Sequence, residues 1–247
     1  MFDRMACLLV VLGTGALGCA PSGVNGAAPT TGFVNKVHHG WDGDAKYVVF
    51  VPYSYDAQQE SPAILFLHGA GQSGVDGEVQ AERGLGQAIR AREATFPFIA
   101  IFPQSQENGW QADSADGRRA MRILDEVQHE YSVDASRIYL TGYSMGGEGV
   151  WSLAAADPIR WAAIVPICPG GNLELADRLK DVPCWCFQGD DDDLSVVSQT
   201  RAMLRAVKAA GGRPTYHEYP GVGHNCWDLT YANADLYEWI LTHKRPG

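Results

Sequence analysis

Short apolar runs recur along the chain and alternate with amphipathic stretches. Three of the runs, ILFL at 64–67, FIAIF at 98–102 and AAIVPI at 162–167, contain no polar residue at all. A strand without a polar face is buried on both sides, which is typical of the central strands of a parallel sheet. The apolar runs predict eight strands, the first weaker than the rest, at Phe33–His38, Lys46–Val51, Ala63–His68, Phe98–Phe102, Arg137–Thr141, Ala162–Ile167, Cys184–Gln188 and Thr215–Tyr219.

Helical patterns lie between the later strands. Gly117–Tyr131 repeats apolar residues at helical spacing on one face, and Ser195–Ala210 does the same before a Gly-Gly stop. Tyr231–His243 predicts a final helix. Strands that alternate with helices indicate a mostly parallel sheet covered on both faces. Ligands of such sheets bind beyond the carboxyl ends of the strands.

Composition narrows the class of protein. The 247 residues are 46% hydrophobic, which allows one sizeable core, and no repeat or charge block divides the chain after residue 32. With 19 basic and 29 acidic residues, the formal net charge is −10. No basic cluster is present that could neutralise phosphates, so we expect no nucleic-acid partner. The prediction is a single domain over 33–247, as a monomer.

The first residues have the pattern of an export signal. The apolar stretch Met5–Leu17 is too short for the ~20-residue helix that spans a bilayer. We therefore expect a signal peptide at 1–19 and a flexible linker at 20–32. Cys19 resembles the lipidated cysteine of bacterial lipoproteins, although Ala16 stands where that motif usually has leucine. Two alternatives stay open: a membrane tether through Cys19, or an ordinary secretory signal cut a few residues later.

Four cysteines lie beyond this segment, at Cys168, Cys184, Cys186 and Cys226. An exported protein can form disulfides, but four cysteines allow three connectivities and spacing does not choose among them. Cys184 and Cys186 would lie on the same face of one strand, which disfavours a bond between them. A Cys168–Cys226 bridge and packed thiols both stay open, and packed thiols are the simpler interpretation.

The strongest chemical signal is Gly142-Tyr143-Ser144-Met145-Gly146, between the strand RIYLT and a helical stretch. The G-x-S-x-G pattern makes a sharp strand-to-helix turn that lifts a nucleophilic serine clear of the sheet, and glycines avoid clashes in that turn. The helix that follows directs its first amides toward developing negative charge. Ser144 is therefore the predicted nucleophile.

A serine nucleophile needs a base and an orienting acid, which follow it in this order in such folds. His224 suits the base, because it lies in a glycine-bearing loop between the last strand and the last helix. Residues 190–193 are four consecutive aspartates after the penultimate strand. The pattern G-x-x-D before an apolar residue favours Asp192 as the acid, and Asp190 is the alternative.

The second donor of an oxyanion hole is expected in the loop after an earlier strand. His68-Gly69-Ala70-Gly71 lies there, so the amides of Ala70 and Met145 are predicted to form the hole, with Gly71 as an alternate. His68 is interpreted as a structural brace of this loop.

The segments LHGAGQSG, GYSMGGEGVW, DPIRWAAIVPICPGG, VPCWCFQGDDD and GVGHNCWD together resemble a family of bacterial α/β hydrolases. It is the phospholipase/carboxylesterase-like (predicted peptidase) branch, similar to polyhydroxybutyrate depolymerase-like and feruloyl esterases. The resemblance covers about residues 45–243. It implies an α/β-hydrolase fold, with a mostly parallel sheet of about eight strands, helices on both faces and no large lid. Gln188 is a departure, since the family commonly has histidine there.

The resemblance implies a serine esterase with no cofactor and no metal, and no His/Cys cluster has metal-ligand spacing. Trp110 and Trp227 could line a hydrophobic cleft, and Gly71, Gln104 and Asp113 could contact substrate. An exported enzyme without a large lid would meet bulky or polymer-borne esters, such as acylated polysaccharides, polyesters or simple aryl and alkyl esters. The alternatives are a serine peptidase on the same scaffold and a non-catalytic binding module descended from hydrolases.

Overall fold

A computed structural model describes residues 30–41, 43–107 and 109–245. The expected signal peptide with Cys19, and the linker up to residue 29, lie outside the described residues.

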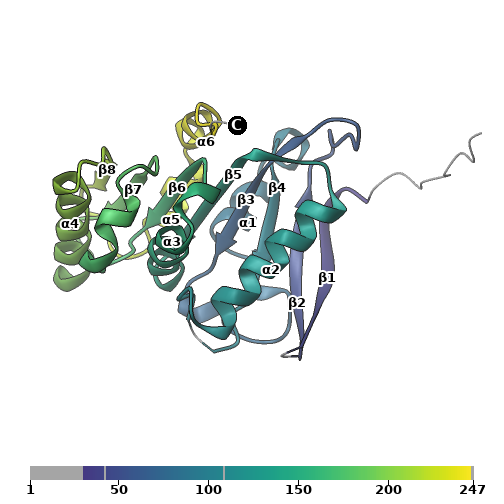
Figure 1. Ribbon diagram of the computed structural model, residues 1–247, viewed down its shortest axis with the longest axis horizontal. Helices are drawn as coiled ribbons and strands as arrows, with labels where there is room; N and C mark the ends of the chain where they lie inside the picture. Colours follow the sequence, from purple (N-terminus) through teal and green to yellow (C-terminus); the bar gives the residue numbers. More distant parts are fainter. Residues whose placement is uncertain (1–29, 42, 108, 246–247) are drawn as a thin grey trace, which may run out of the picture.

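The strands form one eight-stranded sheet in the order β1-β2-β4-β3-β5-β6-β7-β8 (Figure 1). β1 pairs antiparallel with β2, and β2 with β4, while the other neighbours are parallel. The strands are β1 Gly32–Gly40, β2 Gly43–Val51, β3 Ser61–Leu67, β4 Ile99–Pro103, β5 Val133–Tyr143, β6 Ala163–Ile167, β7 Trp185–Gly189 and β8 Thr215–Tyr219. All eight predicted strands are present, and the sheet is mostly parallel as expected.

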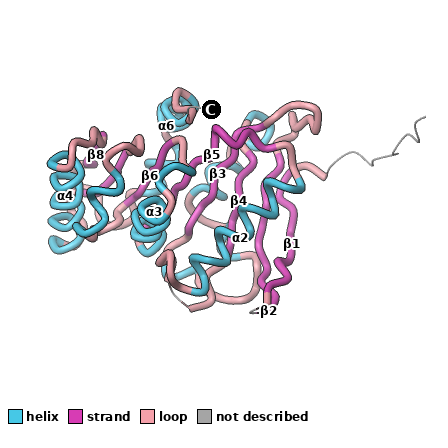
Figure 2. The backbone as a smooth tube through the Cα atoms, viewed as in Figure 1, coloured by secondary structure: helices cyan, strands magenta, loops and turns pink. Residues whose placement is uncertain are grey.

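Helices cover both faces of this sheet (Figure 2). The α-helices are α1 Leu85–Arg90, α2 Ala115–Glu130, α3 Met145–Ala156, α4 Leu194–Ala209, α5 Trp227–Ala232 and α6 Ala234–Leu241. Short 3-10 helices occupy several loops, at η1 Ala70–Gln72, η2 Val79–Ala81, η3 Glu93–Thr95, η4 Pro158–Arg160 and η5 Leu173–Leu179.

Alternate residues of β3 show how the two layers are built. Leu65 and Leu67 are fully buried in a core that includes residues of α2, α3 and α4. Ile64 and Phe66 are buried in a second core, against α1, α5 and α6. Because successive side chains of a strand point to opposite faces, an apolar run without alternation produces two cores. This is the α/β-hydrolase architecture that the family resemblance implied.

The predicted final helix, Tyr231–His243, is wrong in one respect, because it is two helices separated at Asn233. Asn233 has extended backbone (ψ 120°), and its side chain accepts a hydrogen bond from the amide of Asp235. Asparagine favours this capping role over a helix interior because its side chain bonds nearby backbone. α1 was not predicted, since its six residues are too few for a helical period to show.

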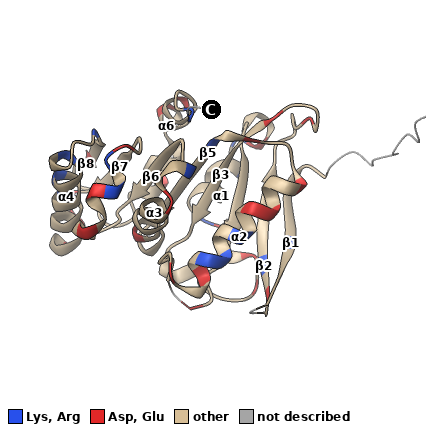
Figure 3. Ribbon diagram, viewed as in Figure 1, with Lys and Arg blue, Asp and Glu red and all other residues tan. Residues whose placement is uncertain are grey.

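Charged residues lie mainly outside the centre of the sheet, and the cysteines of the described residues are buried. Acidic and basic residues lie mainly on helices and loops, and the central strands are almost free of both (Figure 3). The cysteines of the described residues are Cys168, Cys184, Cys186 and Cys226, and all four are buried free thiols. No helix in the described part of the chain is long and apolar enough to cross a bilayer.

Candidate active site

Ser144 lies between β5 and α3, in the strained turn that the motif predicts. Its φ of 56° is in the region that side chains rarely adopt. A Cβ at Gly142 would lie 2.6 Å from the carbonyl oxygens of Leu67 and Gly146, and one at Gly146 would lie 2.0 Å from Leu67 O. Both flanking glycines are therefore required by the close approach of backbone, which is the reason given for the motif.

A continuous hydrogen-bond chain leads away from Ser144. His224 Nε2 lies 2.8 Å from Ser144 Oγ, and His224 Nδ1 lies 2.7 Å from Asp192 Oδ2. The Asp192 side chain is 4% exposed and the His224 side chain 42%. The three residues predicted as nucleophile, base and acid are thus in contact in the expected order, although they come from loops 32 to 80 residues apart. The imidazole that links them is open to solvent.

Gln188 is a member of this chain that the motif analysis noted only as a departure. It is fully buried, and its Nε2 donates to Asp192 Oδ2 at 2.7 Å. Its Oε1 accepts from Thr200 Oγ1 at 3.1 Å. The Gln188 amide therefore donates to Asp192 Oδ2 and, through Thr200, links the Asp192 carboxylate to α4. The other oxygen, Oδ1, accepts from the amide of Asp193.

The loops that carry Asp192 and His224 are joined through their backbones. The amide of Asp191 donates to Val222 O at 3.0 Å, and a Cβ at Gly189 would lie 2.1 Å from the same oxygen. Asp190, the alternative acid, accepts from the amide of Gly221 at 2.6 Å instead of facing His224. Asp190 thus holds the turn that precedes the histidine.

The predicted oxyanion hole lies at two places that the fold brings together. Met145 is the first residue of α3, so its amide has no acceptor within the helix. Ala70 and Gly71 are exposed in η1, at the carboxyl end of β3. Gly69 packs on Tyr143, where a Cβ would lie 2.6 Å from the ring. The loop after β3 therefore lies directly against the residue before Ser144.

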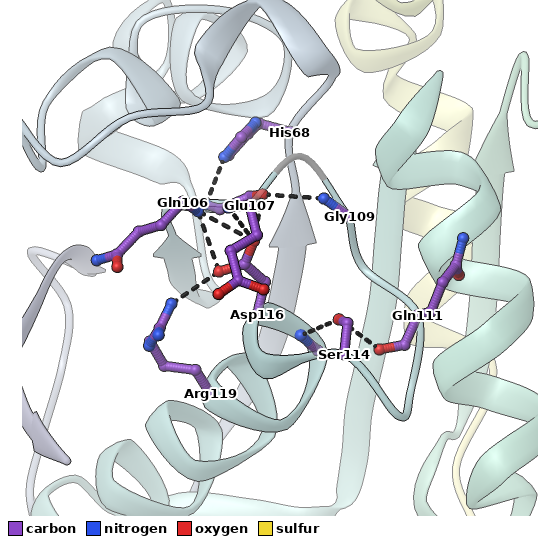
Figure 4. A network of polar contacts seen from close by, with 10 residues as sticks. His68, Gln106, Glu107, Gly109, Gln111, Ser114, Asp116 and Arg119 are labelled. Carbon is purple, nitrogen blue, oxygen red and sulfur yellow. Dashed lines mark hydrogen bonds and ion pairs between the residues drawn. The ribbon is translucent and has the colours of Figure 1, made fainter. Parts of the chain in front are cut away.

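His68 supports the loop after β3 through hydrogen bonds of its ring, as expected. It is fully buried; its Nδ1 donates to Gly69 O at 2.7 Å, and its Nε2 accepts from the amide of Ser105 at 2.9 Å. In Figure 4 the ring of His68 points toward the loop that carries Gln106. The ring can meet both partners only as the neutral Nδ1–H tautomer. Burial lowers the pKa of His68 to about 4, despite the opposing effect of its bond to Gly69.

A buried carboxylate organises the neighbouring loop after β4. Asp116 is 1% exposed and accepts from Ser105 Oγ at 2.6 Å, from the amides of Gln106 and Glu107, and from Arg119 (Figure 4). Ser105 links this cluster to His68 through its own amide. The loops after β3 and β4 are thereby held as one unit.

Two predicted substrate contacts are wrong. Trp110 is 1% exposed, and its Nε1 donates to His68 O at 3.0 Å, so it supports the loop after β3 and lines no cleft. Gln104 is 3% exposed, and both ends of its amide are used within the protein: Oε1 by the amide of Gly77, Nε2 by Gln72 O and the Asp76 carboxylate. Sequence gives the residue type at these positions but not its burial.

The other predicted contacts stay accessible. Trp227 is half-buried, stacks on Tyr143 at 4.3 Å and meets the edge of His224 at 5.7 Å. Gly71 has open space around it, and Asp113 is exposed on the loop after β4. Within the described residues, no group of three or more His, Cys, Asp or Glu side chains could hold a metal ion.

Comparison with known proteins agrees with this geometry. The model of the Esterase family, described as "Putative esterase", matches residues 39–169, more than half of the chain. The chain belongs to the Esterase family. The match spans β2 to the end of β6 and therefore includes Ser144 and the loop after β3.

Individual relatives of this Esterase family member are esterases. It is 27% identical to the "Bifunctional acetylxylan esterase/xylanase XynS20E" of Neocallimastix patriciarum, over 72% of this chain and 26% of the relative. It is 28% identical to the "Probable feruloyl esterase C" of Aspergillus oryzae, over 89% of this chain and 78% of the relative. The chain spans about a quarter of the length of the first two curated relatives that it matches.

Solved structures give the same fold. A thermostable esterase superposes with a TM-score of 0.79 at 28% identity, over 86% of this chain and 63% of the other. The feruloyl esterase module from Clostridium thermocellum, at 18% identity, superposes with a TM-score of 0.63 and supports the α/β-hydrolase fold alone.

Proposed function

We propose that this protein is a carboxylic-ester hydrolase that works through a covalent acyl-enzyme on Ser144. The observation that carries the proposal is the unbroken hydrogen-bond chain from Ser144 Oγ through His224 to Asp192, at 2.8 Å and 2.7 Å. Membership of the Esterase family gives independent support.

In the proposed reaction, His224 Nε2 takes the proton of Ser144 as Oγ bonds to the acyl carbon. Asp192 holds the imidazole in the Nδ1–H tautomer and stabilises the imidazolium. The amides of Ala70 and Met145 donate to the tetrahedral oxyanion. When the intermediate collapses, His224 returns the proton to the departing alcohol oxygen. Water then attacks the acyl-enzyme by the same steps, which releases the acid and restores Ser144.

The proposed substrates are esters of small or polymer-borne acyl groups. Relatives carry the names acetylxylan esterase, feruloyl esterase and poly(3-hydroxyalkanoate) depolymerase. The half-exposed His224 and the exposed Ala70 and Gly71 are compatible with a site that admits a bulky ester. Trp227 is the proposed apolar contact beside the histidine, because one edge of its indole already meets the imidazole.

Hydrolysis of short-chain p-nitrophenyl esters tests this function. Ser144→Ala is expected to lower kcat at least about a thousandfold while the circular dichroism spectrum is retained. Asp192→Asn should cost far more activity than Asp190→Asn, since only Asp192 contacts His224. Full activity in Ser144→Ala would contradict the nucleophile assignment, and the reverse order of the aspartate variants would contradict the assignment of the acid.

We also propose that the protein is exported and that residues 20–32 link the leader to the catalytic domain. The apolar stretch Met5–Leu17 supports this proposal. Detergent-phase partitioning of the full chain, compared with Cys19→Ser, separates a lipid tether from a secretory signal. Partitioning that depends on Cys19 supports the tether; recovery of both forms in the aqueous phase contradicts it.

A further inference from the structure

A cleft of about 450 Å³ lies on the face of the sheet covered by α3, the helix that follows the proposed nucleophile. Glu148 and Trp151 of α3 line it, together with the loop after β4, the segment after β6 and Gln199 of α4. Its volume is in the range of small-molecule sites, roughly 300–1,000 Å³.

The cleft begins one helical turn from Ser144. The amide of Glu148 donates to Ser144 O at 3.0 Å, so the two residues are four apart on the same side of the chain, about 6 Å along the helix axis. The segment that forms the opposite wall, with Gly171 and Asn172, follows β6, and the last residue of β6, Ile167, accepts a hydrogen bond from the amide of Ser144.

The side chains that line the cleft are mostly hydrogen-bonding groups. The carboxylates of Asp113 and Glu148 accept hydrogen bonds, and the amides of Gln111, Asn172 and Gln199 both donate and accept. Among the described residues that line it, none is basic. An anionic ligand would therefore meet two carboxylates without a counter-charge, whereas a neutral group with many hydroxyls could pair with every one of these side chains.

The cleft combines a carboxyl of raised pKa with a buried donor that has no partner. Partial desolvation raises the pKa of Glu148, although the residue stays exposed. Trp151 is 2% exposed, and its Nε1 has no hydrogen-bond partner among the described residues. A buried donor without a partner costs free energy, and Trp151 is one of the residues that line the cleft.

The walls are held in place without a ligand. The amide of Ala112 donates to Ser152 Oγ at 2.9 Å, which ties the loop after β4 to α3. Thr200 Oγ1 donates to Gly170 O at 3.3 Å, which ties α4 to the segment after β6. Gln111 extends away from the Asp116 cluster that anchors its loop (Figure 4). A cleft formed in advance loses less conformational entropy when a ligand binds.

We infer that this cleft binds an uncharged, hydroxyl-rich part of the ester substrate, namely a sugar unit that carries the acyl group. The inference rests on the proposed ester hydrolysis at Ser144. Glu148 and Gln199 face each other across the start of the cleft, as both side-chain oxygens lie within 4 Å of the position of a Cβ on Gly170. These two residues are the specificity-determining pair, and they take no part in bond breaking.

The test compares the methyl ester of an acid with the xylobiose ester of the same acid. The comparison is made once for acetic acid and once for ferulic acid. Gln199→Ala and Glu148→Ala should lower kcat/KM for the xylobiose ester about tenfold, mainly through KM, and leave the methyl ester within about twofold. The matched control is Asp181→Ala, in a second cleft of about 540 Å³ at the amino ends of β6 and β7, whereas Ser144 follows the carboxyl end of β5. Asp181→Ala should leave kcat/KM unchanged for both esters.

Three outcomes are distinguishable. Equal losses on both esters, or no loss on either, would overturn the sugar subsite while ester hydrolysis stands. If the wild type hydrolyses none of the esters, the proposed function fails, and saturation-transfer NMR with xylobiose then tests the cleft alone. Xylobiose signals present with the wild type and lost in Gln199→Ala support the subsite; their absence from the wild type overturns it.

Discussion

At the residue scale, Asp192, the proposed acid of the site, depends on one buried amide. Asp192 Oδ2 accepts from both His224 Nδ1 and Gln188 Nε2, at 2.7 Å each. Gln188 cannot rotate freely, because its other end accepts from Thr200. Gln188 is therefore a positioning residue: it touches neither nucleophile nor substrate, but it sets the direction of the carboxylate that orients His224.

Gln188→Leu keeps the approximate volume and removes both polar ends. Loss of a hydrogen bond to a charged group costs about 2 kcal/mol, so we expect kcat to fall roughly tenfold to thirtyfold with KM little changed.

Kinetics on p-nitrophenyl acetate measure kcat and KM of Gln188→Leu separately. Thr200→Val, which frees the amide without removing it, should show a smaller fall in kcat. A wild-type kcat in Gln188→Leu, or a loss that lies in KM alone, would contradict the positioning role.

At the element scale, the loops after β3 and β4 hold the active-site backbone through buried polar contacts. The Asp116 carboxylate gathers Ser105, the amides of Gln106 and Glu107, and Arg119. Ser105 then positions His68, whose ring fixes the carbonyl of Gly69, the residue before Ala70. A buried network of this kind is stabilising only while every member has its partner.

Asp116→Ala would remove the acceptor that the Ser105 hydroxyl, the amides of Gln106 and Glu107, and Arg119 share. We expect the free energy of unfolding to fall by about 3–5 kcal/mol, which is typical when one partner of a buried ion pair is removed. Urea denaturation followed by tryptophan fluorescence measures it. Asp113→Ala, an exposed aspartate on the same loop, should stay within about 0.5 kcal/mol of wild type. Similar losses in both variants would contradict the network's role.

At the scale of the whole molecule, the neutral state of His68 couples stability to pH. The unfolded chain binds a proton on this histidine below pH about 6.5, but the folded protein does so only below about 4. Protonation therefore favours the unfolded chain, and stability falls as the pH is lowered through this window.

Between pH 7 and pH 5, His68 should contribute a loss of about 2 kcal/mol in the free energy of unfolding. Urea unfolding at pH 7, 6 and 5 gives this dependence for the wild type. His68→Gln keeps a hydrogen-bonding side chain but does not titrate, so its stability should depend less on pH by that amount. If wild type and variant lost stability in parallel, the buried neutral histidine would be contradicted.

Much of the fold could be predicted from local pattern. Runs such as ILFL are apolar at every position, which is typical of strands buried on both faces, and the eight predicted strands are those of the sheet. Ser144 was recognisable for a similar reason, since its flanking glycines are required by backbone that approaches from nearby positions. The order of Ser144, Asp192 and His224 along the chain, with each in a loop after a strand, predicted three side chains that the structure brings into contact.

The sequence by itself determined the sheet, the elbow and the residue types of the site, because these depend on periodicity and on local steric limits. Burial and partners were decided only by the tertiary structure. Trp110 and Gln104 have the chemistry of substrate contacts, yet both are enclosed by the loops they support. In the sequence, Gln188 is only a difference from the histidine that is common in the family. Its positioning role follows from its hydrogen bonds to Asp192 and Thr200. Contacts between distant loops depend on how the strands are ordered in the sheet, and no local pattern encodes that order.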